Sequence, residues 1–97
     1  MIVLTAYGQL QEDGVEMFLE ASHENKAKAQ AEAGCEKFDY YLSAEEPLKF
    51  VFVEEWASME HLEAHFATEH FARFMASMQE CLAAPPDIRI FDATLRP

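Results

Sequence analysis

Segment 48–56 constrains the fold most, because it is apolar on both of its faces. Side chains along a β-strand alternate between the two faces of a sheet, so Phe50 and Phe52 share one face while Val51 and Val53 share the other. An antiparallel sheet with one solvated face would carry polar residues on that face. We therefore expect helices on one side of this strand and the sheet of a second subunit on the other.

Strand-like and helix-like patterns alternate along the chain in the order β-α-β-β-α-α-β. This order is the split βαβ arrangement of a ferredoxin-like α+β fold. It predicts a single domain over residues 1–97, with a four-stranded antiparallel sheet that carries helices on one face and pairs through the other in a dimeric α+β barrel. The expected strands are 2–8, 37–42, 48–56 and 88–95, and the expected helices are 15–33, 59–66 and 69–83.

Helix boundaries follow from capping residues. Asp13 and Glu16 have the spacing of a capping box at the start of the first helix, and Gly34 is expected to end that helix. Ser58 is a good N-cap for the second helix. The apolar stripe of that helix ends at Phe66, and the next stripe begins five residues later at Phe71. A spacing of five residues is not a helical repeat, so the helix is expected to break between them. Thr68 lies at the break and is expected to cap a third helix.

The charge balance excludes two classes of partner. Seven basic residues stand against eighteen acidic ones, a net charge of −11, whereas phosphates and anionic lipid surfaces require Lys and Arg. No leader-like or membrane-length apolar segment is found. Cys35 and Cys81 are too far apart for a redox pair or a zinc knuckle, which indicates reduced thiols. We expect a cytoplasmic protein that binds neither nucleic acid nor membrane.

Three of the four histidines fall between residues 61 and 70. His61 and His65 are four residues apart on one helix face, a spacing that can hold zinc. However, the order His-Leu-Glu-Ala-His is not the metalloprotease motif. A third ligand would have to be Glu54, His70 or a residue from elsewhere in the chain. We favour solvated or hydrogen-bonded histidines and expect no metal.

Glu54 and His65 are candidates for a pair. Glu54 lies on the same strand face as Phe50 and Phe52, and a buried carboxylate needs a partner. His65 lies beside the apolar stripe of its helix, so a contact between Glu54 and His65 would satisfy the carboxylate. This pair could simply lock a helix to the sheet, which the residues alone favour. The alternative is a histidine held in one tautomer as a proton acceptor.

Aromatic and methionine side chains gather in the last third of the chain. Such stripes are usually plain core, but their density also agrees with an apolar cavity for a flat ligand. Tyr40 and Tyr41 lie on opposite strand faces, so only one of them can face such a cavity. The candidate lining residues are Trp56, Phe66, Phe71, Phe74, Met75 and Met78.

Several motifs together resemble the antibiotic biosynthesis monooxygenase-like family of small dimeric α+β barrel proteins. The matching pieces run nearly end to end, and Ala33 stands where the family usually has proline. The most specific piece combines a strand, a tryptophan, a short helix and two histidines at the family's spacing. The pieces are Met1-Ile-Val-Leu-Thr-Ala6, Glu32-Ala-Gly34-Cys35, Tyr40, Glu54-Glu-Trp56-Ala-Ser58, Leu62-Glu-Ala-His65 and His70-Phe71.

The resemblance implies a homodimer in which each subunit holds a pocket between sheet and helices. It also implies oxidation of a small aromatic or quinol-like compound with O2 and without a cofactor. Haem-degrading members carry an asparagine on the first strand and a histidine on the second helix. This chain has no such asparagine, and Met75 lies near the expected position of the histidine, so that branch is disfavoured, as is a signal-degrading one. A non-catalytic module that binds a small apolar ligand is the alternative.

The resemblance also suggests roles for individual residues. Trp56 would be a pocket wall, His65 a base or an orienting group, and His70 an anchor for the last helix. Together with Glu54, His65 is the expected catalytic residue. The expected substrate-binding residues are Trp56, Tyr40, Phe66, His70, Phe71, Phe74 and Met75.

Overall fold

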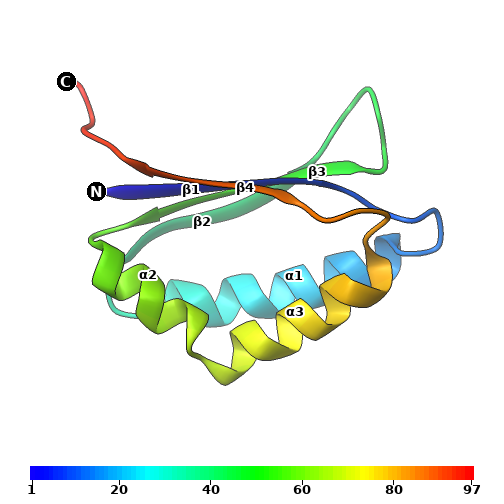
Figure 1. Cartoon of the computed structure of the whole chain (residues 1–97), viewed down its shortest axis with the longest axis horizontal. Coiled ribbons are helices and arrows are strands. Elements are labelled where there is room, and N and C mark those ends of the chain that lie inside the picture. Colours follow the sequence, from blue (N-terminus) through cyan, green and yellow to red (C-terminus); the bar gives the residue numbers. More distant parts are fainter.

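The computed structural model describes residues 1–97 and contains an antiparallel four-stranded sheet with three helices against one face (Figure 1). The strand order is β2-β3-β1-β4. The predicted ferredoxin-like α+β fold and its element order are confirmed. The elements are β1 (Ile2–Gln9), α1 (Val15–Gln30), β2 (Cys35–Leu42), β3 (Lys49–Trp56), α2 (Met59–Phe66), α3 (Glu69–Cys81) and β4 (Asp87–Asp92).

Strand β3 lies between β1 and β2, and its alternation separates core from open face. Phe50, Phe52, Glu54 and Trp56 are all buried beneath the helices. The fully buried Phe18 of α1 packs on this surface, with its ring centroid 4.6 Å from that of Phe50. Each large side chain buried in this way contributes roughly 1.5–3 kcal/mol. The core therefore fixes β3 against α1 and positions every group that projects from β3 toward the helices.

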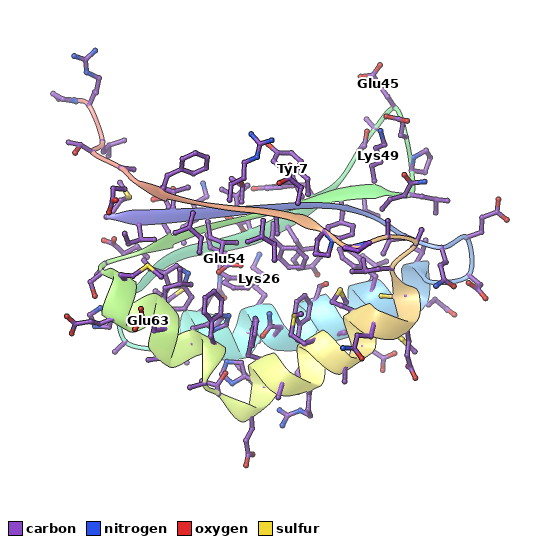
Figure 2. The ribbon with its side chains drawn as sticks, viewed as in Figure 1. Tyr7, Lys26, Glu45, Lys49, Glu54 and Glu63 are labelled. Carbon is purple, nitrogen blue, oxygen red and sulfur yellow. The ribbon has the colours of Figure 1, made fainter.

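The other face of the sheet is not covered by any helix (Figure 1). Tyr7 points away from the helices on this face, whereas Glu54 points toward them (Figure 2). Tyr7, Tyr41 and Phe91 are about half exposed, and Val51 and Val53 of β3 lie between them partly buried. The second apolar face expected from segment 48–56 is therefore present.

All three helices start where predicted, but only two of the three predicted N-caps are correct. Ser58 accepts a hydrogen bond from the backbone N–H of His61, and Thr68 accepts one from Phe71. These caps place the break between α2 and α3 where the apolar stripe is interrupted. The predicted capping box at Asp13 is wrong, because the N-cap of α1 is Gly14 and no side chain caps it.

Helix α1 also ends earlier than expected, at Gln30, and Gly34 lies in the turn that leads into β2. Gly34 has a φ of 80°, which favours glycine. A Cβ atom at this position would lie only 2.2 Å from Cγ of His61. Glycine therefore lets α2 approach the turn closely. None of the three helices has both the length and the apolar character needed to cross a membrane.

Candidate functional site

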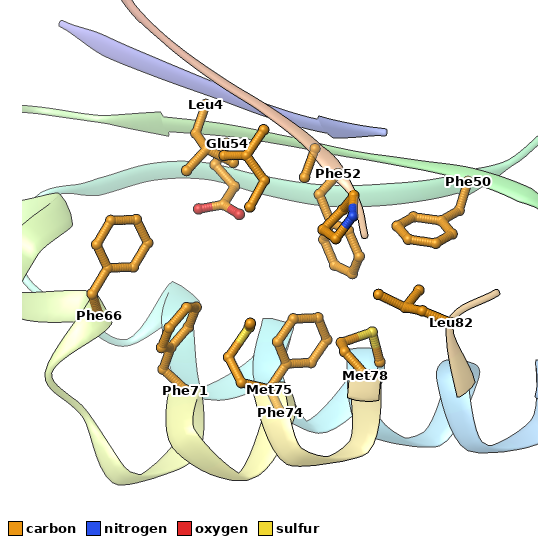
Figure 3. A pocket seen from close by; sticks show the side chains of 13 residues that line it. Leu4, Phe50, Phe52, Glu54, Phe66, Phe71, Phe74, Met75, Met78 and Leu82 are labelled. Carbon is orange, nitrogen blue, oxygen red and sulfur yellow. The ribbon is translucent and has the colours of Figure 1, made fainter. Parts of the chain in front are cut away.

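An apolar cavity of about 80 Å³ lies between the helix-covered face of the sheet and α3 (Figure 3). Strands β1, β3 and β4 supply one wall, and α2 and α3 supply the other. The lining side chains are Leu4, Ala6, Phe50, Phe52, Glu54, Phe66, Phe71, Phe74, Met75, Met78, Leu82, Pro86 and Ile88.

Glu54 is the only titratable residue that lines this cavity. Its carboxylate points from β3 toward the cavity, between the rings of Phe52 and Phe66 (Figure 3). Burial raises the pKa of Glu54 to about 7, and the negative charge of Glu32 adds to that rise. A carboxyl group with such a pKa exchanges protons near neutral pH, which suits a general base.

Trp56 fixes the position of this carboxylate through a hydrogen bond. Its indole Nε1–H donates a hydrogen bond to Oε1 of Glu54 at 3.0 Å, a bond that lowers the pKa of Glu54 and so opposes part of the rise. Trp56 is fully buried and does not line the cavity. No protein group hydrogen-bonds to Oε2 of Glu54. One carboxylate oxygen is therefore fixed, and the other is available to a ligand.

A cluster of three polar residues, Glu32, His65 and His70, lies next to the cavity without lining it. Oε2 of Glu32 lies 2.6 Å from Nδ1 of His65 and 2.8 Å from Nε2 of His70. His65 is buried, with its ring centroid 4.9 Å from that of Trp56 and 5.1 Å from that of Phe71. This burial lowers the pKa of His65, and the hydrogen bond with Glu32 opposes the change.

The expected contact between Glu54 and His65 is absent. Glu54 pairs with Trp56, two residues along the same strand face, and His65 pairs with Glu32 from the turn after α1. The physical reason is that Nδ1 of His65 is directed at the end of α1 rather than at β3. Two polar groups thus take the place of the single pair that we predicted.

The residues that could hold a metal also differ from the pair considered first. Nδ1 of His61 lies 2.8 Å from Oγ of Ser58, so His61 belongs to the start of α2. By contrast, Glu32, His65 and His70 each direct one ligand atom at a common point, and these atoms lie within 4.8 Å of one another.

The predicted site residues fall into two groups. Glu54 lines the cavity together with Phe66, Phe71, Phe74 and Met75. The other four, Trp56, His65, His70 and Tyr40, do not line it. Tyr40 packs instead against Phe18 and Phe52, with centroid distances of 6.0 and 5.6 Å.

Two parts of the site were missed. One is the sheet wall of the cavity, although the alternation along β3 already placed Phe50 and Phe52 on the face of Glu54. The other is Glu32, which was noted in a sequence motif but was given no role. Its partners lie 33 and 38 residues further along the chain, and no local pattern indicates such a separation.

The molecule is thus a small ferredoxin-like α+β protein with an apolar cavity between its sheet and its helices and one carboxylate directed into that cavity. The chain belongs to the antibiotic biosynthesis monooxygenase family, whose model matches residues 1–77. It is 33% identical over 88 residues to YcnE of Bacillus subtilis (strain 168), a protein whose name proposes a monooxygenase activity; the match covers 91% of this chain and 93% of YcnE.

Solved structures agree with this assignment. A protein from Nitrosomonas europaea, named for the same family, superposes with a TM-score of 0.93 at 27% identity and covers 98% of this chain and 100% of its own. A Bacteroides thetaiotaomicron protein of unknown function, described as a candidate oxidoreductase, has a TM-score of 0.86 at 30% identity, over 93% and 94% of the two chains.

Proposed function

We propose that this protein is a cofactor-independent monooxygenase that oxidises a small aromatic of the quinol or anthrone type with O2. The observation that carries the proposal is the carboxylate of Glu54, which is the only titratable group of an apolar cavity and has one free oxygen. The family membership and the name of the Bacillus subtilis relative support the same reaction class.

The reaction needs one proton acceptor and dry surroundings. Oε2 of Glu54 takes a proton from an acidic C–H or O–H group of the substrate, and the resulting anion is delocalised over the aromatic rings. The anion adds O2 to give a peroxide anion, which takes the proton back from Glu54 and becomes a hydroperoxide. The hydroperoxide then loses water, together with the second hydrogen of the same carbon. For an anthrone, one oxygen atom remains as a carbonyl and the other leaves as water, so the substrate supplies all the electrons. Trp56 keeps the carboxylate in place during the transfer.

His65 has a supporting place in this scheme. Its ring packs against both Trp56 and Phe71, so it sets the positions of one residue behind the base and one in the cavity wall. We therefore assign proton transfer to Glu54 and orientation to His65. His70 shares Glu32 with His65 and anchors α3 to the same group.

The cavity must widen to admit a ring system, because typical ligand sites measure roughly 300–1,000 Å³. Met75 and Met78 line both this cavity and a neighbouring surface hollow of about 380 Å³. Methionine side chains are flexible and adapt to irregular shapes. Rotation of these two side chains would join the two spaces, which provides an entry route between α3 and β4.

Oxygen consumption over a panel of hydroquinones and anthrones tests this proposal. We expect at least one compound to be oxidised in a chelator-treated, flavin-free sample. Ala6→Leu fills part of the cavity from β1 and should lower kcat/KM at least about tenfold, as a mismatch of a few methylene groups does. Ala76→Leu, the same change on the exposed side of α3, should leave the rate unchanged.

Two outcomes would contradict the proposal. One is an O2 uptake that does not exceed the background for any compound of the panel. The other is an Ala6→Leu variant that stays folded by circular dichroism and oxidises the substrate as fast as the wild type does.

We also propose that two copies associate through the open sheet face to form a homodimer. This face combines the half-exposed Tyr7, Tyr41 and Phe91 with the valines of β3. Sedimentation velocity at micromolar concentration should show a dimer. Val53→Glu places a charge in the centre of the face and should give monomers, whereas Ala76→Glu on α3 should not. A wild-type protein that stays monomeric would refute this assembly.

A further inference from the structure

We propose that Glu32, His65 and His70 bind a divalent transition-metal ion of the zinc type, and that this ion ties the end of α1 to α2 and α3. The three residues come from three parts of the fold, namely the turn after α1, the last turn of α2 and the first turn of α3. The site is distinct in position and purpose from the cavity, since none of the three residues lines it.

The ligand atoms already lie close to a coordinating arrangement. Tetrahedral zinc with bonds of about 2.0–2.1 Å separates neighbouring ligand atoms by about 3.3 Å. Oε2 of Glu32 is 2.6 Å from Nδ1 of His65 and 2.8 Å from Nε2 of His70. Zinc binding therefore requires the carboxylate oxygen to retreat by about 0.5–0.7 Å from each nitrogen, and the two nitrogens, which lie within 4.8 Å of each other, to reach the same separation. A neutral imidazole becomes a ligand at the facing nitrogen when its proton moves to the other ring nitrogen.

His65 is held in place, whereas the other two ligands can be reached from solvent. The His65 ring lies against Trp56 and Phe71, and its backbone carbonyl accepts a hydrogen bond from Oγ1 of Thr68 at 2.7 Å. The side chains of Glu32 and His70 are 16% and 13% exposed. A metal ion can therefore enter from their side, and water can fill the fourth position, as in open zinc sites.

An unpaired buried group beside His70 provides independent support. Asn25 of α1 is only 2% exposed, and its Oδ1 has no hydrogen-bond partner. Asn25 and His70 line the same small cavity of about 40 Å³, which has room for a water molecule. A metal-bound water is a hydrogen-bond donor, and Oδ1 of Asn25 is an acceptor without a donor. Arg73 also lines this cavity, but two of its N–H groups donate to Glu24.

The ligand set selects the metal class. Two imidazoles with one carboxylate suit zinc, cobalt or nickel, whereas magnesium and calcium prefer oxygen ligands. One carboxylate leaves a local charge of about +1 on bound zinc, which the protein's net charge of −11 tolerates. The ion would replace two hydrogen bonds by coordination bonds among three elements and so raise the melting temperature.

Zinc titration of EDTA-stripped protein by calorimetry tests the site. We expect one Zn²⁺ per chain, no competition from millimolar Mg²⁺, and a higher melting temperature in the zinc-loaded protein. Co²⁺ should give visible absorption bands of a four-coordinate site. His70→Gln and Glu32→Gln should each weaken Zn²⁺ binding by more than about 100-fold, because loss of a mere outer-shell partner already costs 10- to 100-fold.

His23→Gln is the matched control, since His23 is an exposed histidine of α1, and it should bind Zn²⁺ like the wild type. Absence of stoichiometric binding would overturn the proposal. So would His70→Gln and Glu32→Gln variants that bind as tightly as the wild type, or a His23→Gln variant that loses binding. These readouts do not involve O2 uptake, so they are independent of the proposed reaction.

Discussion

Glu54→Gln is expected to lower kcat/KM for oxygen consumption by roughly 10²- to 10⁴-fold, the usual contribution of a general base. Glutamine has nearly the same shape and keeps an oxygen that can accept the Trp56 N–H, so the change removes the base and leaves the cavity in place. Glu63→Gln is the matched control, because Glu63 is an exposed carboxylate of α2. An active Glu54→Gln variant would exclude Glu54 as the base.

The pH profile supplies a second readout of the same role. Only the ionised carboxylate accepts a proton, and the pKa of Glu54 is about 7. We therefore expect kcat/KM of the wild type to rise with pH through about 7 and to level off above it. The residual activity of Glu54→Gln should lack this rise. A wild-type profile that is flat between pH 5.5 and 8.5 would contradict the assignment.

Trp56→Phe is expected to lower the free energy of unfolding by about 3 kcal/mol at pH 8. Part of the loss is packing volume around a fully buried side chain. The remainder arises because the buried carboxylate of Glu54 loses the only hydrogen bond that it accepts from the protein. This second part concerns the charged form of Glu54 and should therefore depend on pH.

The sign of that dependence follows from the pKa of Glu54. The pKa is about 7 in the folded protein and 4.5 for an unperturbed carboxyl, so the folded state holds the extra proton between these values. The associated stability is fully present below pH 4.5 and is lost as the pH rises through 7. Removal of the Trp56 hydrogen bond raises the pKa further, so the variant loses more stability at alkaline pH than the wild type does.

Urea unfolding at pH 5 and pH 8 measures the effect. The difference between wild type and Trp56→Phe should be smaller at pH 5, where Glu54 is protonated and mainly packing is lost. In a Glu54→Gln background, the Trp56→Phe change should cost the same at both pH values. If Trp56→Phe lowered the free energy of unfolding equally at both pH values in the protein that keeps Glu54, this explanation would be wrong.

The apolar faces of β3 and the break between α2 and α3 could be predicted from the sequence, because both depend on local periodicity. The alternation along β3 identified both apolar faces, and the five-residue gap before Phe71 located the start of α3. The end of α1 was misjudged, because Gly34 serves the turn rather than the last helical residues. Asp13 had the spacing for a cap, but the N-cap of α1 is Gly14, and no side chain caps the helix.

The hydrogen-bond partners of Glu54 and His65 could not be predicted from such patterns. Periodicity indicates that Glu54 and His65 are both turned inward, but it does not indicate which polar groups meet there. Glu32 reaches His65 and His70 only after the sheet and three helices have packed. The helix wall of the cavity could be predicted, because Phe71, Phe74, Met75 and Met78 follow one stripe on α3. The hydrogen bonds among Glu32, His65 and His70 depend instead on how the helices pack in the folded protein.

The short break between α2 and α3 has a consequence for the two histidines. His65 and His70 are five residues apart, and in one continuous helix such residues would point about 140° away from each other. Because α2 ends at Phe66 and Thr68 starts a helix with a new direction, both rings meet the same carboxylate oxygen. Fusing the two helices across Ala67 and Thr68 would separate the rings while leaving every residue of the group unchanged. The angle between α2 and α3 therefore brings the two histidine rings, which would otherwise point apart, to the same oxygen of Glu32.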